Sequence, residues 1–282
     1  VVATTEDLAA IAREIGGDKV RVTAIARGYQ DPHFVDPKPS FILEVNRAGL
    51  LIAVGRELEN SWLPSLLTSG RNARVQPGAA GYLDASANVR ILEIPTGQVT
   101  RAMGDVHAQG NPHYWLDPGN GRQIAQAIRA KLSELQPADK AYFDARYADF
   151  DKRLGAAEQR WDATMAPFKG AKLVTYHRSW PNFMERFGLV VTGYVEPKPG
   201  IPPSPSHTIE LIAEMKRQGV KLIVVEPYFD KKTPQSIATQ VGGQVVELAP
   251  SVGGQPGTED YIKLFDYNVR VLSEALRANT AK

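Results

Sequence analysis

Residues 137–168 read PADKAYFDARYADFDKRLGAAEQRWDATMAPF, and this stretch governs how the rest of the chain can be arranged. Gly155 is its weak point, since glycine costs about 1 kcal/mol relative to alanine in a helix. A helix of about 28 residues extends roughly 40 Å at about 1.5 Å per residue, so we expect a rigid rod lying along two lobes. The prediction rests on apolar residues that recur every three or four positions and so share one helical face: Phe143, Tyr147, Phe150, Leu154, Ala157, Trp161 and Met165.

Short apolar runs alternate with helical patterns on both sides of this stretch. Before it, we expect strands at Val1–Thr4, Val20–Ile25 and Leu50–Val54 and helices at Glu6–Ile15 and Pro39–Ala48. After it, we expect strands at Lys172–Thr175, Leu189–Val195, Val220–Val225 and Gln244–Leu248 and helices at Pro181–Phe187, Ile209–Gln218, Pro234–Val241 and Tyr261–Ala278. Residues 70–110 are less regular, and we place no strand there.

The alternation is typical of parallel sheets covered by helices. We therefore predict an α/β chain with two lobes, each a mainly parallel sheet flanked by helices, joined by one long rigid helix. The predicted N-terminal lobe comprises residues 1–136, the linking helix 137–168 and the C-terminal lobe 169–282.

The composition fits a globular protein and excludes several functional classes. The 282 residues are 43% hydrophobic, a usual proportion for a chain with a real core. Lys and Arg number 33 against 31 Asp and Glu, and the net charge of +2 is too balanced for a nucleic-acid-binding surface. The lack of cysteine excludes disulfides, thiolate metal sites and cysteine nucleophiles. No apolar run approaches the roughly 18 residues of a membrane span, and the strand-like start is unlike a signal peptide. We expect either a cytoplasmic protein or a processed, exported form.

The five histidines hold most of the functional information. His33 follows the strand expected at Val20–Ile25, and His177 follows the one expected at Lys172–Thr175. Ligands of open α/β sheets bind at the carboxyl ends of strands, so both side chains should face one crevice. His113 lies in a loop just before a helix and can join them. A single loop histidine is more often solvated or packed, but three that converge form a favoured ligand set for Zn²⁺, at about 2.0–2.1 Å.

Sequence motifs around these histidines resemble those of a known family. They read Asp31-Pro32-His33-x-x-x-Pro37-x-Pro39-Ser40, Asn111-Pro112-His113-x-Trp115-Leu116-Asp117-Pro118 and Val174-Thr175-x-His177. In this order they are similar to the three metal motifs of the zinc/manganese ABC-transporter solute-binding proteins, and the resemblance runs over essentially the whole chain. It implies two α/β lobes joined by a rigid helix, with His33, His113 and His177 as metal ligands. It also implies a periplasmic or otherwise extracytoplasmic monomer, with its signal peptide removed, that delivers a metal ion to a membrane permease.

The sequence leaves the fourth coordination position open. Many family members have an aspartate after the last strand of the second lobe, where this chain has Ala249. Glu226 ends a strand and is our candidate ligand, although a supporting or capping role competes with ligation, and a water molecule is the other candidate. His107 could swing in or capture metal, unless it is simply an exposed loop histidine. We expect Glu196 to orient a ligand histidine, and His207 to have a capping or surface role.

Three imidazoles favour Zn²⁺ over Mn²⁺, because Mn²⁺ prefers carboxylate and water ligands. Cu²⁺ and Ni²⁺ would bind the same nitrogens. The alternative to transport is a three-histidine zinc hydrolase or lyase, in which Glu226 would be the general base. However, the sequence contains neither His-Glu-x-x-His nor Gly-x-Ser-x-Gly. We therefore expect a transport protein rather than an enzyme.

Overall fold

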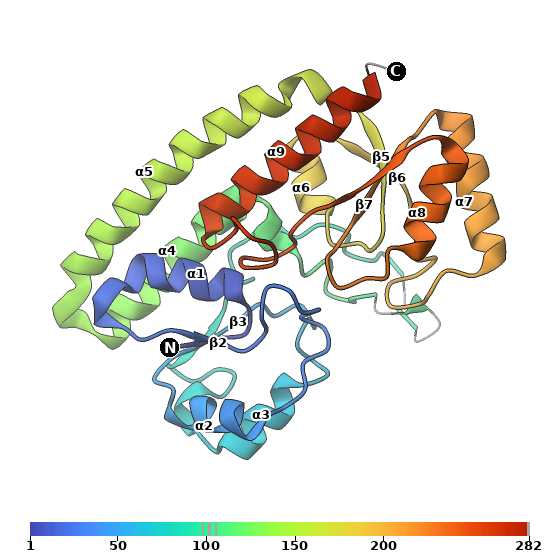
Figure 1. Ribbon diagram of the computed structural model, residues 1–282. Coiled ribbons are helices and arrows are strands. Elements are labelled where there is room, and N and C mark those ends of the chain that lie inside the picture. The colour runs from blue at the N-terminus through green and yellow to red at the C-terminus, as the bar shows by residue number, and fades with distance from the viewer. Residues whose placement is uncertain (98, 101–102, 105, 281–282) are drawn as a thin grey trace.

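The computed structural model describes residues 1–97, 99–100, 103–104 and 106–280, which form two α/β lobes (Figure 1). The N-terminal lobe has a parallel sheet of β1 (Val2–Ala3), β2 (Thr23–Ala24), β3 (Leu51–Ala53) and β4 (Tyr82–Asp84), in the order β2-β1-β3-β4. Its helices are α1 (Glu6–Gly16), α2 (Pro39–Arg47), α3 (Leu63–Gly70) and α4 (Pro118–Leu135), with short 3-10 helices at Gly17–Lys19, Ala73–Val75 and Tyr114–Leu116.

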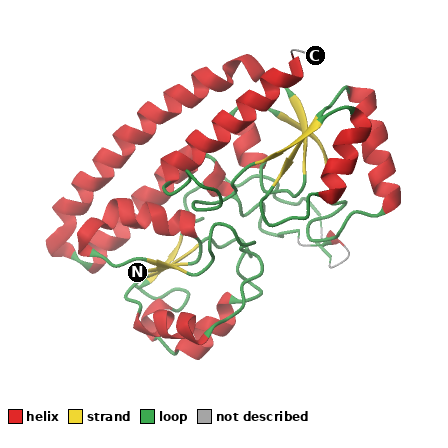
Figure 2. Cartoon of the chain, in the orientation of Figure 1, coloured by secondary structure: helices red, strands yellow, loops and turns green. Residues whose placement is uncertain are grey.

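The C-terminal lobe repeats this topology. Its parallel sheet has the order β6-β5-β7-β8, with β5 at Lys172–Thr175, β6 at Val190–Tyr194, β7 at Leu222–Val225 and β8 at Gln244–Glu247. Its helices are α6 (Pro181–Arg186), α7 (Pro205–Gln218), α8 (Lys232–Val241) and α9 (Tyr261–Thr280). Figure 2 shows the two sheets as separate sets of strands, each with helices around it. The predicted α/β class with two parallel sheets is confirmed.

Helix α5 (Lys140–Met165) is the predicted long helix, with 26 residues. A short 3-10 helix adjoins each end, at Pro137–Asp139 and Ala166–Phe168. The helix runs beside α4 and α1 of the first lobe and beside α9 of the second (Figure 1). Six of the seven apolar residues predicted to share one face are buried, and Tyr147 is partly buried. The burial of this face in the core holds α5 against both lobes.

Some expected elements differ from the observed ones. The strand expected at Val20–Ile25 is reduced to β2, because only Thr23 and Ala24 pair with β1. Strand β4 lies within residues 70–110, where no strand was placed, and it pairs with all three residues of β3. Helix α3 was not predicted either. Residues 281–282 of the predicted C-terminal lobe lie outside the described part of the chain.

The largest hydrophobic core is shared by the two lobes. It includes Leu8 and Ile11 of α1, Trp161 of α5 and Leu264 and Leu272 of α9, all of them buried. Two smaller clusters pack against the other faces of the two sheets. The lobe boundaries predicted from the sequence stay a prediction, because the core continues across them.

Loops from the two lobes also meet directly. Trp115 Nε1 donates a 2.9 Å hydrogen bond to the carbonyl oxygen of Pro250, in the loop after β8. A Cβ atom placed on Gly28 would lie only 1.9 Å from the carbonyl oxygen of Val252. Glycine is therefore required at position 28, where the backbones of both lobes approach each other. Within the described residues, no helix has the length and hydropathy needed to cross a membrane.

Candidate metal centre

Three of the five histidines converge where the lobes meet. His33 lies in the loop after β2, His113 directly before the helix Tyr114–Leu116, and His177 two residues beyond β5. Their candidate ligand nitrogens all lie within 4.8 Å of one another, and the residues are 6%, 2% and 6% exposed. No second group of this kind occurs in the described part of the chain. The structure thus brings together the three histidines that the sequence singled out.

Two of these histidines are held by a side chain two residues earlier in the chain. His33 Nδ1 lies 2.7 Å from Asp31 Oδ1, and the same oxygen accepts from the His33 backbone N–H at 3.0 Å. His113 Nδ1 lies 3.0 Å from Asn111 Oδ1, which accepts from the His113 backbone N–H at 2.9 Å. The repeated Asx-Pro-His spacing therefore fixes both rings, and sequence reasoning missed this role although the spacing was visible.

The third histidine has a support from a different strand. His177 Nδ1 lies 2.7 Å from Oε2 of Glu196, a buried residue just after β6. This is the orienting contact that the sequence predicted for Glu196. At all three histidines the oxygen partner favours the tautomer in which Nδ1 carries the proton. The Nε2 lone pairs are therefore free of the supporting hydrogen bonds and available to a metal ion.

His113 is the most buried of the three, and its environment keeps it neutral. Its Nε2 atom is buried and has no hydrogen-bond partner. Burial lowers the pKa of His113 well below its usual value, and the charges of His33, His177 and His107 lower it further. A buried polar atom without a partner needs an explanation, and a lone pair directed at a bound cation provides one.

A fourth histidine lies beside the group. His107 Nε2 is 3.2 Å from His33 Nε2, and the two rings are stacked with their centroids 5.3 Å apart. Burial, followed by the charges of His33 and His177, lowers the pKa of His107 to about 3. His107 is therefore a half-buried neutral imidazole next to the candidate site, and not the exposed loop residue considered from the sequence.

The chain matches one protein family along almost its whole length. Residues 1–275 match the model of the family described as "Zinc-uptake complex component A periplasmic". The chain belongs to this family. The resemblance drawn from the three histidine motifs is thereby confirmed.

Proteins similar to this chain have names that refer to zinc, to manganese or to metal in general. The chain is 24% identical to the metal ABC transporter substrate-binding lipoprotein ScbA of Streptococcus cristatus, over 98% of this chain and 88% of that protein. It is 22% identical to the high-affinity zinc uptake system protein ZnuA of Bacillus subtilis, over 98% of this chain and 87% of that protein. It is 23% identical to the manganese ABC transporter substrate-binding lipoprotein PsaA of Streptococcus pneumoniae, over 98% and 88%. A crystal structure of ZnuA superposes with a TM-score of 0.80 at 25% identity, covering 97% of each chain.

Glu226, the candidate fourth ligand, does not belong to the histidine group of this zinc-uptake family member. It follows β7 and is fully buried, and its Oε1 atom accepts a 2.9 Å hydrogen bond from Trp180 Nε1. Burial raises the pKa of Glu226 to about 8. Its Oε1 atom is thus engaged with Trp180, and the carboxyl group is predominantly neutral at neutral pH. Ligation by Glu226 stays a prediction.

The remaining candidates also lie outside the group. Ala249 is buried, and its backbone N–H and carbonyl both bond to the side-chain amide of Asn268, at 2.9 and 2.8 Å. His207 is in the first turn of α7, where its Nε2 atom lies 2.9 Å from the carbonyl oxygen of Tyr194. These contacts give Ala249 and His207 structural roles within the C-terminal lobe.

The space beside the histidines is small. A cavity of about 70 Å³ is bordered by His107, His113 and His177, with Asn111 and Arg178 also in its wall. This volume suits an ion with a few water molecules. Two further hollows of about 210 and 270 Å³ adjoin His33 from other sides.

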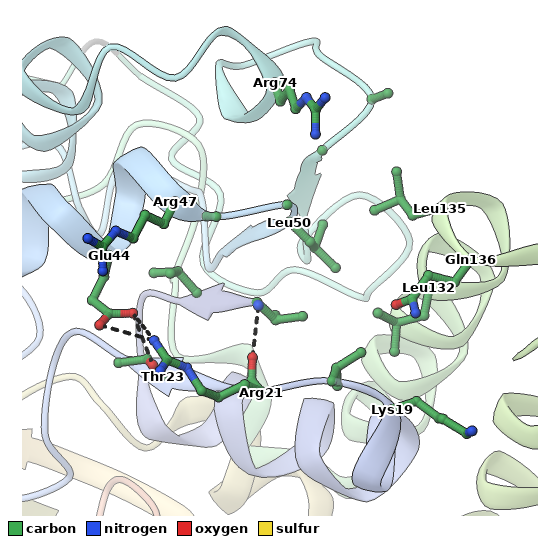
Figure 3. Close-up of a pocket in the computed structure, with 17 residues that line it drawn as sticks. Lys19, Arg21, Thr23, Glu44, Arg47, Leu50, Arg74, Leu132, Leu135 and Gln136 are labelled. Atoms are coloured by element: carbon green, nitrogen blue, oxygen red, sulfur yellow. Dashed lines mark hydrogen bonds and ion pairs between the residues drawn. The ribbon is translucent and has the colours of Figure 1, made fainter.

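A larger cavity, of about 620 Å³, lies elsewhere in the N-terminal lobe (Figure 3). Lys19, Arg21, Arg47 and Arg74 give its wall a cationic character, and Leu132 adds to an apolar side. Its lining includes residues at the amino ends of β1 and β3 and none of the grouped histidines. It is therefore separate from the candidate metal centre, which lies beyond the carboxyl ends of strands.

Proposed function

We propose that this chain is the solute-binding subunit of a metal ABC transporter, which carries one ion of the zinc class on His33, His113 and His177. The observation that carries the proposal is the convergence of three buried imidazoles, each supported at Nδ1. Membership of the zinc-uptake family supports it independently. The cargo ion is the substrate of the chain, and its release to a permease completes the function.

The ligand set favours zinc as the cargo. The names of the relatives include both zinc and manganese proteins, so likeness alone leaves the ion open. The three grouped ligands are all imidazoles, whereas Mn²⁺ prefers carboxylate and water oxygens. The carboxylates of Asp31 and Glu196 are bonded to Nδ1 atoms, so they act on the histidines rather than on the ion.

The same chemistry argues for transport over a zinc hydrolase or lyase. A hydrolase needs a general base beside the metal-bound water. Glu226, the base considered from the sequence, is bonded to Trp180 and is predominantly protonated at neutral pH. We further propose that the chain works outside the cytoplasmic membrane, as a monomer, and passes its ion to a membrane permease. Its relatives named as substrate-binding lipoproteins of metal ABC transporters support the delivery to a permease.

The decisive experiment combines elemental analysis with calorimetric titration. Protein purified without added metal is analysed for bound ions, then stripped and titrated with Zn²⁺ and Mn²⁺. We expect one Zn²⁺ per chain, with weaker Mn²⁺ binding. His113→Ala should lower Zn²⁺ affinity by orders of magnitude, whereas His207→Ala, which removes a histidine outside the group, should not. Wild-type protein that binds no zinc, or His113→Ala that binds as tightly as wild type, would overturn the proposal.

A further inference from the structure

The imidazole of His107 lies against that of His33 at the edge of the histidine group. The two Nε2 atoms are 3.2 Å apart, and the rings are inclined by only 29°. His107 also borders the small cavity shared with His113 and His177, and a second cavity shared with His33. Among the described histidines outside the group of three, only His107 brings an imidazole nitrogen to this position.

The separation of the two nitrogens matches a shared metal ion. In a tetrahedral zinc site with bonds of about 2.0–2.1 Å, neighbouring ligand nitrogens lie about 3.4 Å apart. The observed 3.2 Å between His33 and His107 is close to that value. In this structure the contact is a hydrogen bond, which His107 Nε2 donates because His33 carries its proton on Nδ1. Once the His107 proton moves to its own Nδ1, one ion can replace the hydrogen between the two Nε2 atoms with little change in their separation.

We propose that His107 is the fourth ligand of the cargo ion, and that the resulting four-nitrogen site selects zinc-class ions against manganese. The inference rests on the proposed function, since it adds a ligand to the same site. It accounts for the position that Ala249 cannot fill, and it does so without Glu226, which lies outside the histidine group. Structural zinc almost always takes four ligands in a tetrahedron.

The side chain of His107 turns inward when the ion binds. Its ring contacts His33, but it is not among the three residues whose ligand atoms all lie within 4.8 Å of one another. A rotation toward His113 and His177 brings its Nε2 atom to the open corner of the tetrahedron. Binding thereby moves a side chain of the N-terminal lobe without displacing either sheet.

The chemical consequence is a site without oxygen ligands from the protein. Four neutral imidazoles suit Zn²⁺ and Co²⁺, whereas Mn²⁺ binds best to carboxylates and water in a larger coordination shell. A three-histidine site completed by water would discriminate less, because the water position leaves room for further oxygen ligands. His107 is thus a specificity-determining residue.

The test compares His107→Ala with wild type and with His207→Ala in the full chain. Co²⁺ replaces Zn²⁺ as a spectroscopic probe, and its visible absorption reports the ligand set. In His107→Ala we expect the Co²⁺ spectrum to change as water enters, and added imidazole to restore it. Zn²⁺ affinity should fall by at least about tenfold, and the preference for Zn²⁺ over Mn²⁺ should shrink. His207→Ala should match wild type in all of these measurements.

The outcomes separate the two proposals. If wild type binds zinc and His113→Ala does not, while His107→Ala keeps the wild-type affinity and Co²⁺ spectrum, the fourth-ligand proposal is overturned and the proposed function stands. If wild type binds no zinc, the proposed function itself fails. A thermal unfolding midpoint of His107→Ala equal to that of metal-free wild type would exclude misfolding as the cause of a lost affinity. If that midpoint is lowered, recovery of the Co²⁺ spectrum with imidazole decides for ligation, and its failure decides against it.

Discussion

Ser251 Oγ donates a 2.7 Å hydrogen bond to Asp7 Oδ2, and the two residues are 244 positions apart in the chain. The backbone N–H of Val252 donates to the other carboxylate oxygen at 2.9 Å. Asp7 belongs to α1 of the N-terminal lobe, and Ser251 to the loop after β8 of the C-terminal lobe. Burial raises the pKa of Asp7 to about 7, although both hydrogen bonds act in the opposite direction. The lobes are therefore joined by a buried carboxyl group that titrates near neutral pH.

This raised pKa predicts a pH-dependent effect of Asp7→Asn on stability. At pH 5.5 the folded chain holds a proton on Asp7 that the unfolded chain, with a carboxyl pKa near its ordinary value, has released. The wild-type free energy of unfolding therefore falls as the pH rises, until the folded chain also releases this proton at about pH 7. Asparagine has no such proton, so between pH 5.5 and pH 8 the variant should gain about 1–2 kcal/mol relative to wild type.

Chemical denaturation of metal-free protein at the two pH values measures this difference. Both proteins share every other titrating group, so the comparison isolates Asp7. A difference between variant and wild type that stays constant from pH 5.5 to pH 8 would mean that the carboxyl is ionised throughout.

Glu196→Gln tests the support of His177. Glutamine can still accept from Nδ1, but it removes the negative charge that makes the imidazole a better ligand. We expect Zn²⁺ affinity to fall by about 10- to 100-fold, with little change in the fold. Calorimetric titration measures the effect, and Glu210→Gln, on the exposed surface of α7, is the matched control. Equal affinities for the two variants would show that the charge of Glu196 has no influence on the ion.

Glu226→Gln distinguishes a ligand from a residue of the core. Its carboxyl is bonded to Trp180, and burial raises its pKa to about 8, so a neutral amide resembles its state at pH 7. We expect an unchanged Zn²⁺ affinity at this pH. Relative to wild type, the variant should become more stable as the pH rises from the ordinary carboxyl range to about 8, because over that range only the folded wild-type chain still holds a proton that the unfolded chain has released. A large loss of affinity at pH 7 would instead mean that Glu226 reaches the ion.

The parts of the fold that were predictable have strong local signals. The face containing Phe150 and Trp161 repeats over many helical turns, so its periodicity identifies α5 without any tertiary information. Strand β4 has only three residues, and it exists because Tyr82, Leu83 and Asp84 find partners along β3. Such a strand depends on pairing with distant residues, which a local pattern does not record.

The candidate site likewise has residues that the sequence identified and residues whose role only the structure reveals. His33, His113 and His177 were identified by their motifs and by their places after strands or before a helix. The support from Asp31 follows from a two-residue spacing and was within reach of sequence reasoning. The position of Glu226 was not, because the end of β7 gave its place along the chain but not the rotation of its side chain toward Trp180.

The shared core predicts that the lobes move little when the ion binds. Helix α5 packs on α1, α4 and α9, and a continuous α-helix bends only gently without a break. Small-angle scattering should therefore give the same radius of gyration with and without Zn²⁺. Amide exchange should slow mainly at residues 106–111, which include His107 and the Asn111 support. A clear decrease in the radius of gyration on zinc binding would contradict this prediction and indicate closure of the lobes.

The core that continues through both lobes also has a kinetic consequence. Since no large rearrangement stands between the hydrated ion and the three supported imidazoles, the loading rate should be governed by the ion. The slow step becomes the exchange of the ion's own water molecules for nitrogen ligands, and binding that needs no conformational change proceeds without that further delay. Zn²⁺ exchanges its water quickly and Ni²⁺ slowly, so nickel would load late even where its equilibrium affinity equals or exceeds that of zinc. In a short encounter with mixed ions, the chain would thus discriminate by time as well as by affinity.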